Sequence, residues 1–192
     1  MFWQQERHST VKGLAAGAIG GMVASFVMNQ FQAGMSKLFE EPQAPHRREQ
    51  ARQAQGWKEH RGGQQQQQDG GEENATVKAA VAISENVFDH QLAPQEKPSA
   101  GNAVHYATGI LTGAVYGAAA ENLDVVRAGE GTAFGAMVWA IADEVTVPGL
   151  RLSRPPREYP LRTHVMALSA HLVYGVTTEM VRRALRAGAL SR

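Results

Sequence analysis

Residues 13–36 of the chain read GLAAGAIGGMVASFVMNQFQAGMS, 24 consecutive positions without a charged side chain. A membrane-spanning helix needs about 20 mostly apolar residues to cross about 30 Å of hydrocarbon. The main alternative, a four-helix bundle in water, needs a polar stripe along the outer face of each helix. This stretch has almost no such stripe, so it predicts a transmembrane helix.

Three later segments are also poor in charge. Their ionisable residues are His105 in residues 98–120, Asp143 and Glu144 in residues 131–150, and His164 and His171 in residues 163–178. We therefore predict an all-α, polytopic membrane bundle. Its four transmembrane helices are expected at residues 11–36, 101–121, 128–148 and 163–183.

The remaining residues are much more polar, and they lower the mean hydropathy of the chain to −0.31. Residues 37–75 include the run Gln64–Gln68 and cannot bury enough apolar surface to offset the entropy of ordering, so they predict a disordered Gln/Gly-rich linker. Residues 76–92 have the spacing of an amphipathic helix that lies at the membrane interface or against the bundle, and Pro94 and Pro98 are expected to end it. The other polar segments are a tail at 1–10, a Pro/Arg-rich loop at 149–162 and a tail at 184–192.

Glycines recur at four-residue spacing within the apolar segments. Small residues at this spacing allow membrane helices to approach closely, whereas in a water-exposed helix each glycine costs about 1 kcal/mol relative to alanine. We expect these glycines to pack helices together, either within the chain, in a homo-oligomer or against other membrane helices. They are Gly13, Gly17, Gly21, Gly109, Gly113, Gly117, Gly131, Gly135 and Gly175.

Two pairs of segments suggest an internal duplication. Val115-Tyr116-Gly117 is followed by Glu121, and Val173-Tyr174-Gly175 is followed by Glu179 at the same distance. In a second match, the spacing of Gly17, Gly21 and Asn29 equals that of Gly131, Gly135 and Asp143. The chain could thus be two helix pairs in the same orientation. Chance similarity between Gly-rich helices is the alternative.

Several of these motifs resemble a family of bacterial membrane proteins. They are Gly131-Thr-Ala-Phe-Gly-Ala-Met-Val-Trp139-Ala-Ile-Ala-Asp143-Glu144 with Val147-Pro148-Gly149-Leu150, Ser169-Ala-His171-Leu-Val-Tyr-Gly175, and His105-Tyr106 with Gly113-Ala-Val-Tyr-Gly117. The chain resembles the YagU-like inner-membrane proteins over the four apolar segments but not over the Gln-rich insert. This resemblance implies a multi-pass protein of the bacterial inner membrane and no established reaction.

Ionisable side chains inside a membrane are costly and usually face protein or water. The candidates for a relay or pathway are His105, Asp143, Glu144 and His171, with Asn29 as a neutral partner. Glu121, Glu179 and His164 lie near helix ends and are expected to be interfacial charges in water. Arg182 and Arg183 are expected to mark the membrane boundary.

We predict that His171 faces the interior of the bundle and meets Asp143 or Glu144 there, together with His105. A carboxylate beside an imidazole lowers the cost of burying both, since each favours the charged form of the other. The two acidic residues are adjacent, so on an α-helix they diverge by about 100°. We therefore expect one to point inward and the other to reach the interface.

Most familiar chemistries are not indicated. The chain has no cysteine, and its formal charge of +1 gives no reason to expect a nucleic-acid partner. It lacks the nucleophile-elbow, zinc-protease and phosphate-loop motifs, and its His and carboxylate spacing specifies no metal site. We predict no catalytic residues and no cofactor. The remaining functions are transport or proton relay, a structural or accessory role through Gly-rich helix faces, and a membrane enzyme with a His-carboxylate site.

Overall fold

The computed structural model describes residues 2–39 and 74–190, and these residues form helices and no strand. The prediction of an all-α fold is confirmed. Residues 40–73, which make up most of the predicted linker, lie outside the described part. The helical elements are α1 (Phe2–Phe39), α3 (Ala75–Phe88), α4 (Lys97–Ala120), the 3₁₀ segment η1 (Asp124–Gly131), α5 (Thr132–Trp139), the π-helical segment η2 (Ala140–Thr146), α6 (Val147–Gly149), the 3₁₀ turn η3 (Pro156–Glu158) and α7 (Leu161–Leu190).

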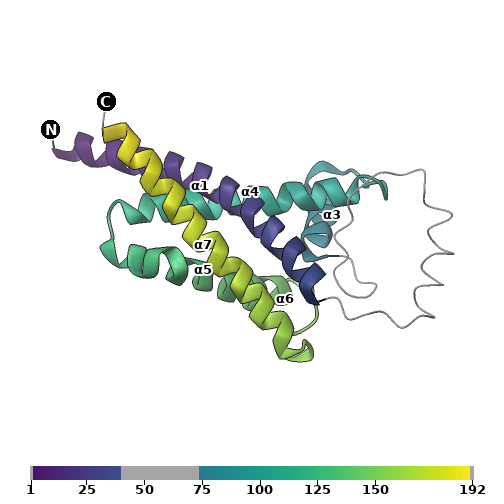
Figure 1. Ribbon diagram of the computed structural model, residues 1–192. Helices are drawn as coiled ribbons and strands as arrows, with labels where there is room; N and C mark the ends of the chain where they lie inside the picture. Colours follow the sequence, from purple (N-terminus) through teal and green to yellow (C-terminus); the bar gives the residue numbers. More distant parts are fainter. Residues whose placement is uncertain (1, 40–73, 191–192) are drawn as a thin grey trace.

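Two long helices, α1 and α7, cross at the centre of the molecule (Figure 1). α4 packs along α1, and α5 packs along α7. The first and last helices bring the two ends of the chain close together at one end of the bundle, whereas α3 and α6 lie toward the other end (Figure 1). The fold is thus two helix pairs joined through contacts between α1 and α7.

By length and hydropathy, one described helix could cross a membrane. It is residues Ser9–Leu38 of α1, with a mean hydropathy of 1.6. The other three predicted spans coincide with α4, with the run from η1 to α6, and with α7. The described helices therefore do not confirm four transmembrane segments.

Glycines bring the helices of each pair into backbone contact. A Cβ placed on Gly113 of α4 would lie 2.5 Å from the carbonyl oxygen of Gly17 in α1. In the second pair, a Cβ on Gly175 of α7 would lie 2.6 Å from the backbone nitrogen of Gly135 in α5. No larger residue fits at these positions without separating the helices, since protein interiors are close-packed.

The two pairs use equivalent contacts. Gly13 lies against Gly117 and Glu121, and Gly131 lies in the same way against Gly175 and Glu179. α4 and α7 therefore hold equivalent positions in the two helix pairs, as the Tyr-Gly motifs indicate. The second sequence match, which aligned Gly17, Gly21 and Asn29 with Gly131, Gly135 and Asp143, is wrong by one helical turn. In the structure, Gly13 and Gly17 of the first pair are equivalent to Gly131 and Gly135 of the second.

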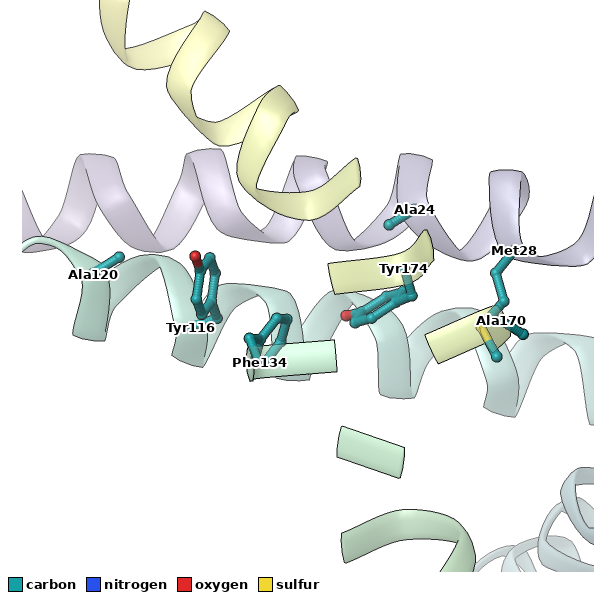
Figure 2. Close-up of a cluster of buried hydrophobic side chains, with 7 residues drawn as sticks. All are labelled: Ala24, Met28, Tyr116, Ala120, Phe134, Ala170 and Tyr174. Atoms are coloured by element: carbon teal, nitrogen blue, oxygen red, sulfur yellow. The ribbon is translucent and has the colours of Figure 1, made fainter. Parts of the chain in front are cut away.

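A small aromatic cluster fills the space between the pairs (Figure 2). The rings of Tyr116 and Phe134 stack with their centroids 4.2 Å apart, and Tyr174 lies 5.8 Å from Phe134. The remaining buried members of the cluster come mostly from small residues: Ala24, Met28, Ala120 and Ala170. This core is narrow because the glycine contacts leave little room for large side chains.

Polar side chains are buried beside the apolar core, and many large apolar side chains are exposed. The largest fully buried side chains of the described residues are Glu179, Thr178 and Ser25, all of them polar. Large apolar side chains instead lie exposed along all the main helices: Val11, Leu14, Ile19, Met22, Phe26, Leu111, Val115, Met137, Ile141, Val145, Val165, Met180 and Leu185.

The amphipathic segment packs on the bundle. α3 buries Ala80 and Ser84, and its Val77 contacts α4 at Gly101, while Val87 and Phe88 remain exposed. The helix ends at Phe88 because Asp89 adopts a left-handed conformation with φ 50°. The expectation that Pro94 and Pro98 end it is wrong, and Pro98 instead lies in the first turn of α4.

Candidate functional site

A π-helical segment places two carboxylates against α7. In η2 the backbone departs from α-helical hydrogen bonding between Ala140 and Thr146, and Pro148, which has no N–H to donate, follows two residues later. Such π segments inside α-helices are frequent at functional sites. Here the segment contains both Asp143 and Glu144, and each faces a histidine of the same neighbouring helix.

Asp143 lies beside His171. The Nδ1 atom of His171 is 3.6 Å from Oδ2 of Asp143 and 2.9 Å from the carbonyl oxygen of Ala167. The histidine side chain is 11% exposed and the carboxylate 36%, so the pair is more buried on the α7 side than on the η2 side.

Glu144 meets the second histidine, His164, two turns earlier on α7. Its Oε1 atom is 2.7 Å from Nδ1 of His164, and the carbonyl oxygen of Pro156 lies 2.9 Å from Nε2. When Glu144 is ionised both partners are acceptors, so the imidazolium form of His164 fits this geometry because both of its ring nitrogens donate. Asp143 thus points to the more deeply buried histidine, whereas Glu144 pairs with His164, which lies in the first turn of α7 with its side chain 24% exposed.

His105 lies near enough to His171 for the charges of the two rings to interact. Its ring also faces the backbone of Ser25 in α1. Three buried polar atoms in the described part of the chain have no hydrogen-bond partner: Nε2 of His105, Oγ of Ser25 and Nε1 of Trp139. Asn29, the neutral candidate, is half-buried one turn after Ser25.

A network of charged residues lies at the end of the bundle where the two chain termini meet (Figure 1). Arg182 donates from Nε to Glu179 at 2.7 Å and from Nη1 to Glu121 at 3.0 Å, so it joins the equivalent carboxylates of the two helix pairs. Tyr116 donates to Glu179 at 2.9 Å, and Arg186 donates to Glu121 at 2.6 Å.

The burial of this network corrects two expectations. Glu179 is 1% exposed and Arg182 4%, and the side chain of Glu121 is 9% exposed. These residues are therefore not charges in water at helix ends. Three further contacts belong to the network: Arg183 pairs with Glu179 and with Glu130, and Ser9 donates to Glu121 at 2.6 Å.

Hydroxyl groups lie between the histidines and the network. Tyr174 donates to the carbonyl oxygen of Gly109 at 2.6 Å, and its hydroxyl is 2.8 Å from that of Thr112. Thr178 donates to the carbonyl oxygen of Tyr174 at 2.8 Å. One helix thus carries a row of polar side chains through the bundle. We call this the α7 polar row, and it consists of His164, His171, Tyr174, Thr178, Glu179, Arg182 and Arg186.

Sequence reasoning selected the histidine end of this row and missed the carboxylate network. The signal for the network was present in the two Tyr-Gly motifs, since each tyrosine precedes its glutamate by five residues. No metal site is indicated, because no group of three His, Asp or Glu side chains among the described residues is placed to hold an ion.

Comparison with known proteins gives one match. A family model described as "Protein of unknown function (DUF1440)" matches residues 31–180. No curated protein and no solved structure matches the chain.

Proposed function

The chain belongs to this family of proteins of unknown function, and we propose that it is a multi-pass membrane protein that relays protons through His171 and Asp143, alone or coupled to a solute. The YagU-like resemblance supports a place in the bacterial inner membrane. The observation that carries the proposal is the α7 polar row, which runs through the interior of a bundle with many large apolar side chains exposed on its surface.

The membrane part of the proposal rests on the exposed apolar side chains. In water, surface patches of this kind are rare and mark contact with other molecules or lipid. Here they lie on α1, α4, the segment from α5 to η2, and α7, which are the four proposed spans. The buried polar side chains fit the same proposal, since polar groups in lipid are placed toward the protein interior.

The relay part rests on the different accessibility of the two ends of the row. His164, Glu144 and Asp143 have side chains that are 24%, 25% and 36% exposed. At the other end, Glu179 and Arg182 pair in a nearly inaccessible network. Protons would therefore enter the row at its histidine end.

The alternative, a structural protein that binds other helices through Gly-rich faces, has less support. The glycines of the predicted rows already contact one another within the chain. Gly34, Gly149 and Gly188 have open space around them, but they do not form a row.

Proton movement into proteoliposomes tests the proposal. The proteoliposomes contain a pH-sensitive dye, and a potassium diffusion potential is applied across the membrane. The protein should then acidify the lumen. Both His171→Ala and Asp143→Asn should reduce the rate of acidification at least tenfold. The control is His90→Ala, because His90 is 61% exposed and lies outside the row. The relay would be contradicted if the wild-type protein acidified the lumen no faster than empty liposomes do, both with and without candidate solutes.

A further inference from the structure

We propose that His164 is a pH-sensitive latch for the loop of residues 150–160. While its ring is protonated, the ring ties this loop to the bundle, and when the ring loses its proton the loop is released. The inference rests on the contacts of His164 and depends neither on the membrane location nor on proton relay.

The ring of His164 joins the loop to η2. Its Nδ1 atom is 2.7 Å from Oε1 of Glu144 in η2, and its Nε2 atom is 2.9 Å from the carbonyl oxygen of Pro156, the first residue of η3. The side chains of His164 and Glu144 are both partly buried, so water competes only in part for these bonds. One side chain of α7 thus holds two other segments of the chain, one through each ring nitrogen.

The two contacts need two ring protons. An imidazolium donates from both nitrogens, whereas a neutral imidazole donates from one only. The bond to an ionised carboxylate is charge-assisted and is the stronger of the two, so the remaining proton stays on Nδ1, toward Glu144. Nε2 then presents a lone pair to the carbonyl oxygen of Pro156, and this contact becomes repulsive. Loss of one proton therefore breaks the bond to the loop and keeps the bond to η2.

The charged surroundings of the ring determine at which pH the latch is closed. Among the described residues, Glu144 is the one charged side chain that acts on this ring, because Asp143, which precedes it in η2, pairs with His171 instead. A free imidazole titrates at about pH 6.5, and a neighbouring carboxylate favours its protonated form. The latch is therefore closed at acid pH, and it opens as the pH rises through the range in which the ring loses its proton.

Several contacts hold the loop together internally. The guanidinium of Arg154 lies over the ring of Tyr159, 5.6 Å from its centroid, and the backbone N–H of Arg154 donates to the hydroxyl of Tyr159 at 3.3 Å. The backbone N–H of Glu158 donates to the carbonyl oxygen of Pro155 at 3.0 Å. None of these contacts involves His164, so they can persist when Pro156 detaches. We expect the released loop to move as a unit rather than to unfold.

Spin labelling of the purified full-length protein tests the latch. The chain has no cysteine of its own, so a nitroxide can be attached to Arg157→Cys, an exposed position directly after Pro156. The label should be immobilised at about pH 5 and mobile at about pH 9, on either side of the range in which an imidazole titrates. A label on Ala128→Cys, which is exposed in the connection between α4 and α5, is the control and should not change with pH.

Two variants assign the transition to this site. His164→Gln keeps one donor but cannot titrate, so the label on the loop should have the same mobility at both pH values. The matched control is His90→Gln, because His90 is 61% exposed and lies outside this site, and it should leave the transition unchanged. Glu144→Gln keeps the imidazole but removes the carboxylate, and should therefore move the midpoint of the transition to lower pH.

Three results would each overturn the proposal. They are a wild-type loop whose mobility does not change with pH, a transition that persists in His164→Gln, and an unchanged midpoint in Glu144→Gln. Because Glu144→Gln retains the ring of His164, it tests the latch even if His164→Gln does not fold.

Discussion

At the residue scale, Arg182 is the side chain on which the two helix pairs converge. It binds Glu179 of its own helix and Glu121 of α4, which hold equivalent positions in the two pairs. Burying charges in this way is favourable only if every charge keeps a partner. Here each carboxylate has more than one donor, because Tyr116 and Arg183 also reach Glu179, and Ser9 and Arg186 also reach Glu121.

Removing one buried charge should therefore destabilise the bundle strongly. Glu179→Gln leaves the guanidinium of Arg182 with one carboxylate, and breaking a buried ion pair typically costs about 3–5 kcal/mol. We expect a clear drop in the unfolding temperature of the protein in detergent. Glu130→Gln is the control, since Glu130 is 70% exposed and such pairs contribute about 0–1 kcal/mol. Equal losses in the two variants would show that the network does not hold the pairs together.

Residue-level contacts were also the hardest to predict. Asp143 and His171 stood out because each is an ionisable group deep in an apolar segment. Glu179 did not, since its partner Tyr116 lies 63 positions away in the sequence. Its two arginine partners, Arg182 and Arg183, are close in sequence but are equally consistent with a membrane boundary. The available signal was the repeated Tyr-Gly motif with its glutamate five residues after the tyrosine. The sequence does not show that the two copies of this motif contact each other in the fold.

At the element scale, the helices follow from the charge-poor segments. The glycine rows indicate which helix faces make close contacts, but not which helices they contact. The π-helical form of η2 does not follow, because Ala140–Thr146 contains no residue type that requires it. This segment changes the direction of Asp143 and Glu144, so that both face α7. The site therefore contains two His-carboxylate pairs, Asp143 with His171 and Glu144 with His164.

The contact between α1 and α4 depends on the absence of side chains. Gly113→Ala would place a Cβ 2.5 Å from the carbonyl oxygen of Gly17, so the two helices must separate. We expect a loss of 1–3 kcal/mol, about the cost of overpacking a core, measured as a lower unfolding temperature. Gly34→Ala is the matched control, because open space surrounds Gly34 and alanine favours a helix by about 1 kcal/mol. Unchanged stability of the Gly113 variant would mean that α1 and α4 are not in backbone contact.

At the scale of the whole molecule, the Gln-rich insert should be dispensable for folding. Its residues lie outside the described part of the chain, so this prediction rests on its low-complexity composition alone. Deletion of residues 43–71 should leave the protein in the membrane fraction with an unchanged unfolding temperature. Loss of embedded protein after the deletion would indicate that this segment packs against the bundle.

The four-span arrangement is the central claim, and labelling of introduced cysteines tests it most directly. The chain has no cysteine of its own, so Ala128→Cys and Glu158→Cys each give a single thiol at an exposed position. Ala128 lies in the connection between α4 and α5, and Glu158 lies in the connection between α6 and α7. An impermeant maleimide applied to intact spheroplasts and to inverted vesicles should label these two positions from opposite sides of the membrane. Labelling of both positions from the same side would contradict the arrangement.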